Sequence, residues 1–180
     1  MSDSTVAGET EAMGTQDGQV VEEAFAFPAA LAQEFTELLT HYPQKQAALI
    51  PMLHRCQEDL GGWLRPEHLW ACAEFLDMAP VEVFGVASFY PMFHLQPVGK
   101  HVVGVCHNVV CHIRGAEELL ARAVKVTGAE VGGVSKDGKW SIVRLECQGA
   151  CTAAPMIDLD GEFHENLSAD DVERILGGVK

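Results

Sequence analysis

In the stretch Val102-Val-Gly-Val-Cys106-His-Asn-Val-Val-Cys111, a short apolar run ends at the first of two cysteines, and this pattern is the main indication of the fold of the second half of the chain. A similar pattern returns in Trp140-Ser-Ile-Val-Arg-Leu-Glu-Cys147-Gln-Gly-Ala-Cys151. Runs of this length are typical of strands, and the first resembles a buried strand of a parallel sheet. Each cysteine pair therefore follows the end of a predicted strand.

The segments around these two strands predict an α/β unit of roughly 80 residues. Residues 117–126 have the apolar spacing of a helix. Asp160-Gly161 is a strong hairpin signal between strands predicted at residues 156–159 and 162–164. Ser168 is a good N-cap for a last helix over residues 170–176. The second half thus has the order strand, helix, strand, strand, strand, helix.

Residues 25–96 show a helical period instead. Four short helices are expected: from Pro28 to just before Pro43, over residues 44–60 ahead of Gly61-Gly62, from Pro66, and from Pro80. The last of them carries Val81, Phe84 and Ala87 at helical spacing. The predicted fold class is therefore α+β, an N-terminal helical bundle followed by an α/β domain.

Composition and charge exclude several function classes. The 180 residues carry a formal net charge of −14, and the acidic residues 1–24 predict a disordered tail. An acidic chain without a basic stripe repels phosphate, so no nucleic-acid partner is expected. No apolar run reaches the ~20 residues that cross a bilayer, and the first residues lack the basic and apolar regions typical of a secretory signal. We therefore expect a cytoplasmic protein without direct membrane insertion, in which disulfides are uncommon.

The six cysteines divide by their context. Cys56 and Cys72 fall on apolar stripes of predicted helices, where a free cysteine behaves as a small buried hydrophobe. The other four follow predicted strands in loops of mostly small residues: Cys106, Cys111, Cys147 and Cys151. Two loop pairs suit a 2Fe-2S cluster, because each iron takes two cysteines and the loop N–H groups can point at the sulfurs. A helix beginning near Gly115 would direct its positive end toward such a cluster.

Other uses of the four cysteines stay open on this pattern alone. A structural zinc site, which would make the chain a scaffold, usually takes a tight Cys-x-x-Cys knuckle that is absent here. A dithiol oxidoreductase would need the same spacing at a helix start. A Rieske centre would use His107 and His112, but each directly follows a cysteine, so we expect both in the outer shell or on the surface. Disulfides among the four are the last alternative.

At these residues the chain resembles a known family. Cys106-His-Asn-Val-Val-Cys111 and Glu146-Cys147-Gln-Gly-Ala-Cys151-Thr-Ala-Ala-Pro155 are similar to motifs of the thioredoxin-like 2Fe-2S ferredoxin subunit of NADH:quinone oxidoreductase, respiratory complex I. Segments of its helical domain also have counterparts here: Tyr42-Pro-Gln-Lys-Gln-Ala-Ala-Leu-Ile-Pro-Met-Leu53, Gly62-Trp-Leu-Arg-Pro-Glu67, Val83-Phe-Gly-Val-Ala-Ser-Phe-Tyr90 and Pro97-Val-Gly-Lys100. The resemblance covers about residues 28–176.

The resemblance implies a thioredoxin-like domain over residues 97–180 whose single 2Fe-2S cluster is bound by Cys106, Cys111, Cys147 and Cys151. It also implies that a cis proline is common at the position of Pro155, although the sequence leaves the isomer open. The chain would be an electron-transfer subunit of an NADH dehydrogenase and would not be catalytic alone.

The resemblance further implies the partners. The chain would dock against a flavin-bearing NADH-binding subunit, which holds the FMN and the NADH, and other subunits of the peripheral arm. Phe89-Tyr90 would lie near that contact. The complex would place the chain on the cytoplasmic face of the inner membrane. Equivalent subunits of NAD-linked hydrogenases and NAD-dependent formate dehydrogenases are the alternative assemblies.

Overall fold

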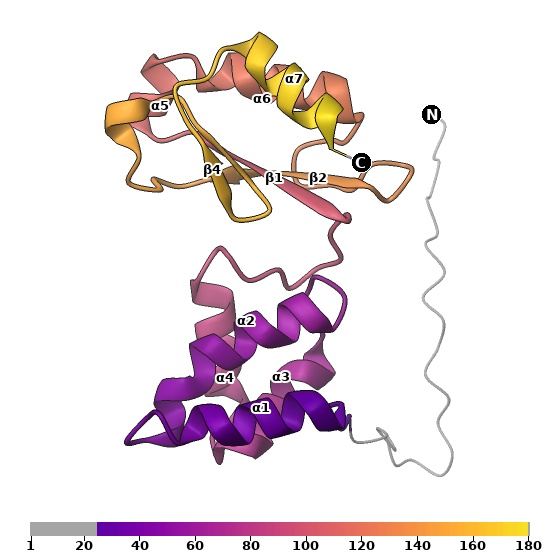
Figure 1. Ribbon diagram of the computed structural model, residues 1–180, viewed down its shortest axis with the longest axis vertical. Coiled ribbons are helices and arrows are strands. Elements are labelled where there is room, and N and C mark those ends of the chain that lie inside the picture. Colours follow the sequence, from indigo (N-terminus) through magenta and orange to yellow (C-terminus); the bar gives the residue numbers. More distant parts are fainter. Residues whose placement is uncertain (1–24, 180) are drawn as a thin grey trace, which may run out of the picture.

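The computed structural model describes residues 25–179, so the predicted acidic tail lies outside the described residues. A helical half comes first and an α/β half follows (Figure 1). The helical half consists of α1 (Ala29–Leu39), the short 3-10 helix η1 (Lys45–Ala48), α2 (Leu49–Asp59), α3 (Pro66–Leu76) and α4 (Pro80–Phe89). The predicted α+β class is therefore confirmed.

The second helix begins later than the sequence predicts. The expected helix over residues 44–60 is divided into η1 and α2, which begins at Leu49. Pro51 explains the difference, because it has no N–H to donate to a preceding turn and is tolerated only near the start of an α-helix. The buried stripe of α2 is otherwise as expected: Leu49, Met52, Leu53 and Cys56.

Helix α4 presents a different face to the core than its spacing suggests. The buried residues of α4 are Val83 and Ala87. Val81 and Phe84 are 74% and 53% exposed. Because α4 is apolar on nearly every side, its periodicity does not select one face, and packing against α2 and α3 makes the choice.

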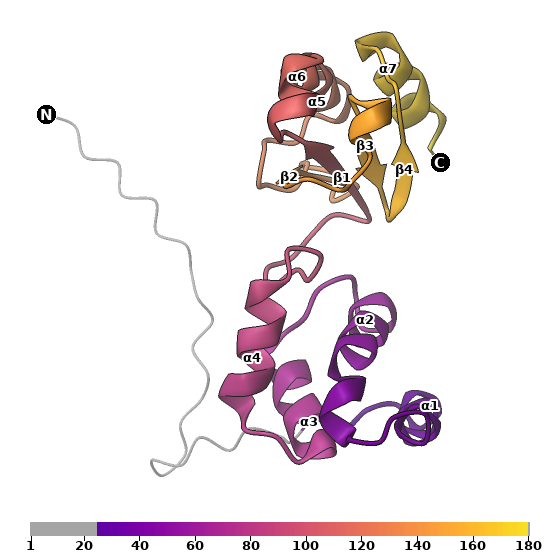
Figure 2. The ribbon, with the colours of Figure 1, turned by 90° about the vertical axis from the view of Figure 1, so that its left-hand side faces the viewer.

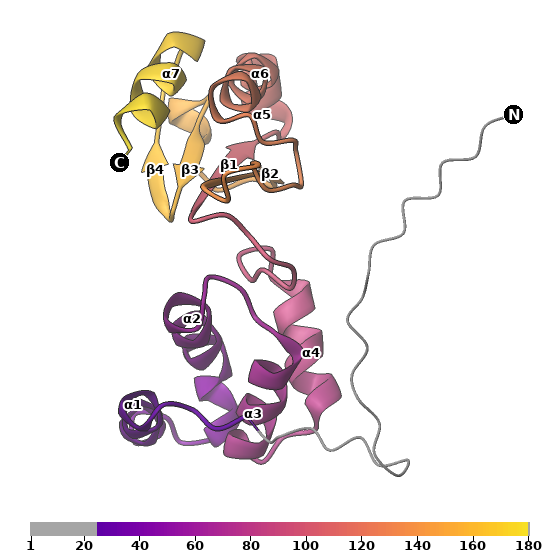
Figure 3. The ribbon, with the colours of Figure 1, turned by 90° about the vertical axis from the view of Figure 1, so that its right-hand side faces the viewer.

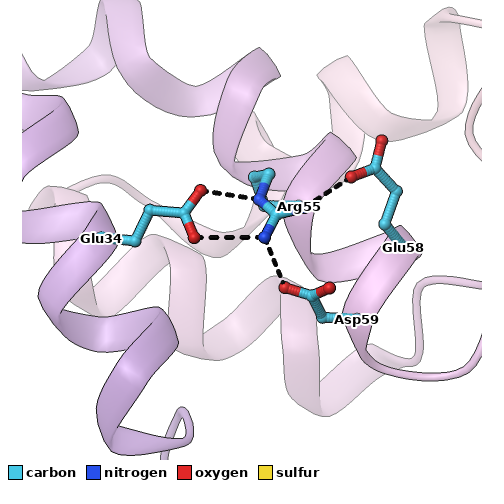
Figure 4. Close-up of polar contacts among 4 residues, drawn as sticks. All are labelled: Glu34, Arg55, Glu58 and Asp59. Carbon is cyan, nitrogen blue, oxygen red and sulfur yellow. Dashed lines mark hydrogen bonds and ion pairs between the residues drawn. The ribbon is translucent and has the colours of Figure 1, made fainter.

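An arginine joins α1 to α2 on the surface of the helical half. The Arg55 guanidinium donates two hydrogen bonds to the carboxylate of Glu34, with Nε to Oε1 at 2.7 Å and Nη2 to Oε2 at 3.1 Å (Figure 4). It also bonds to Glu58 and Asp59 in its own helix, at 2.7 and 2.9 Å. This paired geometry holds the pKa of Glu34 below its usual range.

The α/β half is built on one sheet with the order β2-β1-β3-β4. Its elements are β1 (His101–Cys106), α5 (Val109–Ile113), α6 (Ala116–Thr127), β2 (Trp140–Leu145), the 3-10 helix η2 (Cys151–Ala153), β3 (Ile157–Leu159), β4 (Glu162–His164) and α7 (Ala169–Gly178). β1 and β2 run parallel, whereas β1 with β3 and β3 with β4 run antiparallel. The hairpin turn is confirmed, with positive φ at both Asp160 and Gly161.

Helices α6 and α7 cover the same face of this sheet, as opposite views show (Figure 2 and Figure 3). Their apolar side chains form one core with the strand residues beneath them: Val103, Val105, Ile142 and Ile157 with Leu119, Leu120, Ala123, Val172 and Leu176. This packing fixes β1 and β2, and with them the segments that carry the four cysteines.

The helical half has a separate core, which extends from Leu31 to Phe93. Gln57 holds the segment after α4 to this half, through hydrogen bonds to the backbone of Met92 and His94. Gly99 instead donates to the Ser141 hydroxyl of the α/β half. We therefore propose the domain division at residues 96–97 that the sequence predicts. No helix within residues 25–179 is long and apolar enough to cross a membrane.

Candidate metal centre

Both cysteine pairs begin where a strand ends. β1 ends at Cys106, and β2 ends at Leu145, shortly before Cys147. The two strands are parallel neighbours, and Cys106 lies opposite Leu145 in their register. Because parallel neighbours have their carboxyl ends at the same edge of a sheet, the strands deliver both pairs to that edge.

The expectation that all four cysteines lie in loops is wrong for Cys111. This residue lies inside α5, and Cys151 is the first residue of η2. The single turn of α5 buries Cys111 while Val109 and Ile113 remain 64% and 77% exposed. A helix of five residues is too short for an apolar period to show in the sequence, which explains why it was missed.

The second cysteine pair is exposed and closely spaced. The Sγ atoms of Cys147 and Cys151 are 3.5 Å apart. The backbone N–H of Gly149 donates to Cys147 Sγ at 3.4 Å, as expected for a loop that turns its N–H groups toward sulfur. Gly149 has φ of +81°, a conformation that glycine adopts without the steric cost of a side chain.

The first cysteine pair is buried instead. Cys106 and Cys111 are each 2% exposed. Burial and a hydrogen bond with the Cys106 thiol raise the pKa of Cys111 to about 11, although the Met156 N–H that bonds to this sulfur acts in the opposite direction. Met156 follows the Ala154–Pro155 peptide bond, which is cis. Cys111 thus keeps its proton until a metal ion replaces it.

The two pairs also interact with each other. The pKa of Cys151 is raised first by its hydrogen bond with Cys147 and also by the more distant Cys106. Cys151 likewise contributes to the raised pKa of Cys111. Within residues 25–179, no three His, Cys, Asp or Glu side chains gather closely enough to hold one metal ion. The cysteines are in contact as two pairs, Cys106 with Cys111 and Cys147 with Cys151. Two pairs fit a 2Fe-2S cluster, in which each iron binds two thiolates.

The two histidines beside the cysteines take different positions. The Nδ1–H of His107 donates to the Leu145 carbonyl at 2.8 Å, and its backbone N–H donates to the same oxygen at 3.1 Å. His107 therefore ties the first cysteine segment to the end of β2. His112 lies on the surface, with Nδ1 3.8 Å from a Glu117 carboxylate oxygen. Both positions agree with the outer-shell or surface placement that the sequence predicts.

Sequence reasoning missed the ion pair between Arg144 and Glu117. Arg144 of β2 donates to the Glu117 carboxylate at 3.1 Å, and this pairing lowers the pKa of Glu117. Glu117 lies in the first turn of α6, the helix that begins after Gly115 as predicted. Opposite charges 27 residues apart give no local signal, so only the packing of α6 on β2 could identify the pair.

The remaining two cysteines lie in the other core. Cys56 and Cys72 are 0% exposed, which confirms the prediction that both are buried in the helical bundle. Their Sγ atoms are 3.7 Å apart. The sequence predicted their burial but contained no indication that they touch.

Comparison with known proteins matches residues 35–180 to the family model of the thioredoxin-like 2Fe-2S ferredoxins. The chain belongs to this family. It is 33% identical over 146 residues to an NADH-quinone oxidoreductase subunit of Rickettsia bellii, a match that covers 80% of this chain and 87% of the relative. It is 36% identical over 152 residues to NADH-quinone oxidoreductase subunit 2 of Thermus thermophilus, with 82% and 83% covered. The resemblance stated from the motifs is thereby confirmed.

A solved structure supports the fold. The chain matches the NAD+-reducing NiFe hydrogenase in its air-oxidized state with a TM-score of 0.61 and 21% identity. The match covers 72% of this chain but only 22% of the hydrogenase chain, so this chain spans about a fifth of that protein's length. At this identity the likeness concerns the fold. The assignment of Cys106, Cys111, Cys147 and Cys151 as cluster ligands stays a prediction.

Proposed function

We propose that this protein is an electron-transfer subunit of an NADH-quinone oxidoreductase and that it holds one 2Fe-2S cluster. The main support is that two cysteine pairs lie at the same edge of the sheet, in a chain that belongs to a 2Fe-2S ferredoxin family. Cys106 and Cys111 would hold one iron, and Cys147 and Cys151 the other. The bound cluster would supply one-electron oxidation and reduction.

The chain's own groups would bind and tune that cluster. The N–H groups of Gly149 and Met156 donate to sulfur, and donors of this kind favour the added negative charge of the reduced state. His107 holds the first cysteine segment against the end of β2. The burial of one pair keeps water from half of the centre, while the exposure of Cys147 and Cys151 leaves the other half open to a partner.

The proposed partner is a flavin-bearing subunit that binds NADH and FMN. The names of the relatives from Rickettsia bellii and Thermus thermophilus support an NADH-quinone oxidoreductase as the assembly. In that assembly the cluster would exchange electrons with FMN, and the chain would be part of a peripheral arm at the cytoplasmic face of the membrane. Alone it would catalyse no reaction.

The second candidate function is the equivalent subunit of an NAD-linked hydrogenase. The structural likeness to the NAD+-reducing NiFe hydrogenase favours this reading. Both assemblies would use the same four cysteines, so the centre itself does not distinguish them. Co-purification of the tagged full-length chain from its own cells separates the two, because the partners differ in carrying either quinone-reductase or hydrogenase activity.

Anaerobic purification of the full-length protein tests the centre directly. We expect two irons and two acid-labile sulfides per chain, visible absorption, and a paramagnetic resonance signal after reduction with dithionite. A colourless protein that contains one zinc, even after attempted cluster reconstitution, would instead support the four-cysteine zinc scaffold.

The flavin partner requires a second experiment. The holoprotein is mixed with the purified flavin-bearing subunit, and the absorption of its cluster is followed after addition of NADH. We expect bleaching only when both proteins are present. Bleaching by NADH without the flavin partner, or none with it, contradicts the proposed electron exchange.

A further inference from the structure

Two further thiols, those of Cys56 and Cys72, meet in the core of the helical half. Cys56 lies in the last turn of α2 and Cys72 in the middle of α3, two helices that pack against each other. Their sulfurs are 3.7 Å apart, and both side chains are 0% exposed. The pair belongs to the core formed by the helical half, whereas Cys106 and Cys111 belong to the core of the α/β half.

The separation of these sulfurs is close to that of two thiols in van der Waals contact. A disulfide needs about 2.0 Å between the sulfurs, together with β-carbons roughly 4 Å apart. Rotation of the two side chains about their Cα–Cβ bonds can shorten the distance between the sulfurs. Helices α2 and α3 pack against each other, and the two sulfurs already meet at their contact.

The surroundings of the pair keep it reduced while the helices are packed. The core that contains the pair is apolar, and its other members include Phe35, Met52, Leu53, Leu69 and Leu76. The pKa of Cys72 is raised by its hydrogen bond with Cys56 and by its burial, so the reactive thiolate form of Cys72 is scarce. An oxidant therefore reaches these thiols only when α3 loosens locally from α2.

We propose that Cys56 and Cys72 form a redox-convertible pair, which a low-molecular-weight disulfide oxidises to a bond that clamps α2 to α3. In the first step the Cys56 thiolate attacks a sulfur of oxidised glutathione and releases one glutathione thiolate. In the second step the Cys72 thiolate attacks the mixed disulfide at the Cys56 sulfur and releases the second. The pair loses two electrons and two protons, and the two glutathione molecules gain them.

This bond would join residues 16 positions apart, so it would restrict the unfolded chain and stabilise the packed helices. It would use none of the four proposed cluster ligands. The helical half would therefore gain stability under oxidising conditions while the α/β half keeps its thiols for metal. This inference goes beyond the proposed function and does not depend on it.

Peptide mapping of the full-length protein, as purified, tests the clamp. The protein is incubated anaerobically with oxidised glutathione, alkylated with iodoacetamide, and digested with a protease that cleaves after glutamate. Cleavage after Glu58 and Glu67 separates the two cysteines, so the bond would join the peptides of residues 38–58 and 68–74. We expect this linked pair and a rise in melting temperature of roughly 5 °C or more, both reversed by dithiothreitol.

Cys56→Ala is the matched control, and it should give neither the linked peptides nor the rise in melting temperature. The clamp is refuted if both cysteines are recovered alkylated after denaturation, or if each carries glutathione without a bond between them. A linked pair that leaves the melting temperature unchanged also contradicts it. The peptide map of the unaltered protein decides the question even where the variant folds poorly.

Discussion

Two thiol pairs in this protein have nearly the same sulfur separation and very different surroundings. The Sγ atoms are 3.7 Å apart in Cys56 and Cys72 and 3.5 Å apart in Cys147 and Cys151. Cys56 and Cys72 are fully buried between helices, whereas Cys147 and Cys151 are exposed at the edge of a sheet. Distance alone therefore does not determine what a thiol pair can bind, and the groups around the sulfurs must decide.

The two thiol pairs differ first in the backbone N–H donors that are available to their sulfurs. Within a helix each N–H is committed to a carbonyl one turn earlier, so the segments that carry Cys56 and Cys72 have few donors to offer a charged sulfur. The loop after β2 has such a donor in Gly149. A second reason for the difference is the nearby cysteine pair, since Cys147 and Cys151 share their edge of the sheet with Cys106 and Cys111.

The largest effect is expected from removal of one proposed ligand. Cys147→Ser should reduce iron and acid-labile sulfide close to zero, because a cluster bound by three thiolates loses the closed coordination of one iron. Cys56→Ser should retain both at the level of the unaltered protein. The measurement is metal and sulfide analysis with the visible spectrum, on both variants purified anaerobically side by side.

An equal loss of iron in the two variants would contradict the division of the cysteines. Since Cys147 is exposed, its serine variant should also keep its secondary structure. Circular dichroism of both proteins separates a lost ligand from a lost fold.

A smaller effect on the same centre is expected at His107. His107→Phe removes the side-chain hydrogen bond to the Leu145 carbonyl, which joins the segment after Cys106 to the end of β2. Loss of one such bond corresponds to about 1 kcal/mol, or about fivefold faster release of the cluster. The measurement is the decay of visible absorption at a fixed temperature under anaerobic conditions.

His107→Asn is the matched control, because its amide nitrogen can occupy the place of Nδ1 and donate to the same carbonyl. We expect it to restore most of the half-life. If the phenylalanine and asparagine variants decay at the same rate, the hydrogen bond does not hold the centre together.

The sequence predicts the parts of this comparison that depend on local pattern. Strands followed by a cysteine pair, a hairpin at Asp160-Gly161 and burial of Cys56 all follow from short-range spacing, and the structure confirms them. The four proposed ligands could be named because two closely spaced cysteine pairs are a local motif. Their role in binding iron stays a prediction.

The remaining features depend on how distant elements pack. The contact of Cys56 with Cys72 requires α2 and α3 to meet in one register, and neither helix encodes that by itself. The bond between His107 and Leu145 likewise depends on the parallel register of β1 and β2. The sequence does not indicate the exposure of Phe84, because α4 is apolar on nearly every side.

A modest stability effect is expected for the buried pair. Cys56→Ala should lower the free energy of unfolding by about 1 kcal/mol, because it removes one small buried side chain and leaves a small cavity. Urea unfolding in the presence of dithiothreitol measures this effect without any contribution from a disulfide. Iron content should not change.

A double-mutant cycle sharpens the same measurement. Cys72→Ala should cost a similar amount, and the double variant should cost less than the sum, because the two sulfurs touch and their deletions share one cavity. Strict additivity would mean that the two thiols are energetically independent despite their contact.

The smallest effect is expected at Arg55, which lies half-buried at the surface of the helix that also carries Cys56 (Figure 4). Arg55→Met removes the paired hydrogen bonds to Glu34, so the melting temperature at pH 7 should fall by less than in Cys56→Ala. The pKa of Glu34 is lowered in the folded protein, first by its hydrogen bond with Arg55. Its stabilising contribution is therefore present above the pKa of the unfolded chain.

The sign of the pH dependence follows from that shift. As the pH falls through the lowered pKa of folded Glu34, the carboxylate is protonated and its attraction to Arg55 is lost. The difference in melting temperature between the unaltered protein and Arg55→Met should therefore shrink as the pH is lowered from 7 toward 3. A difference that grows in acid would refute the ion pair as its cause. A change in iron content would show that the helical half and the proposed centre are coupled, which two separate cores argue against.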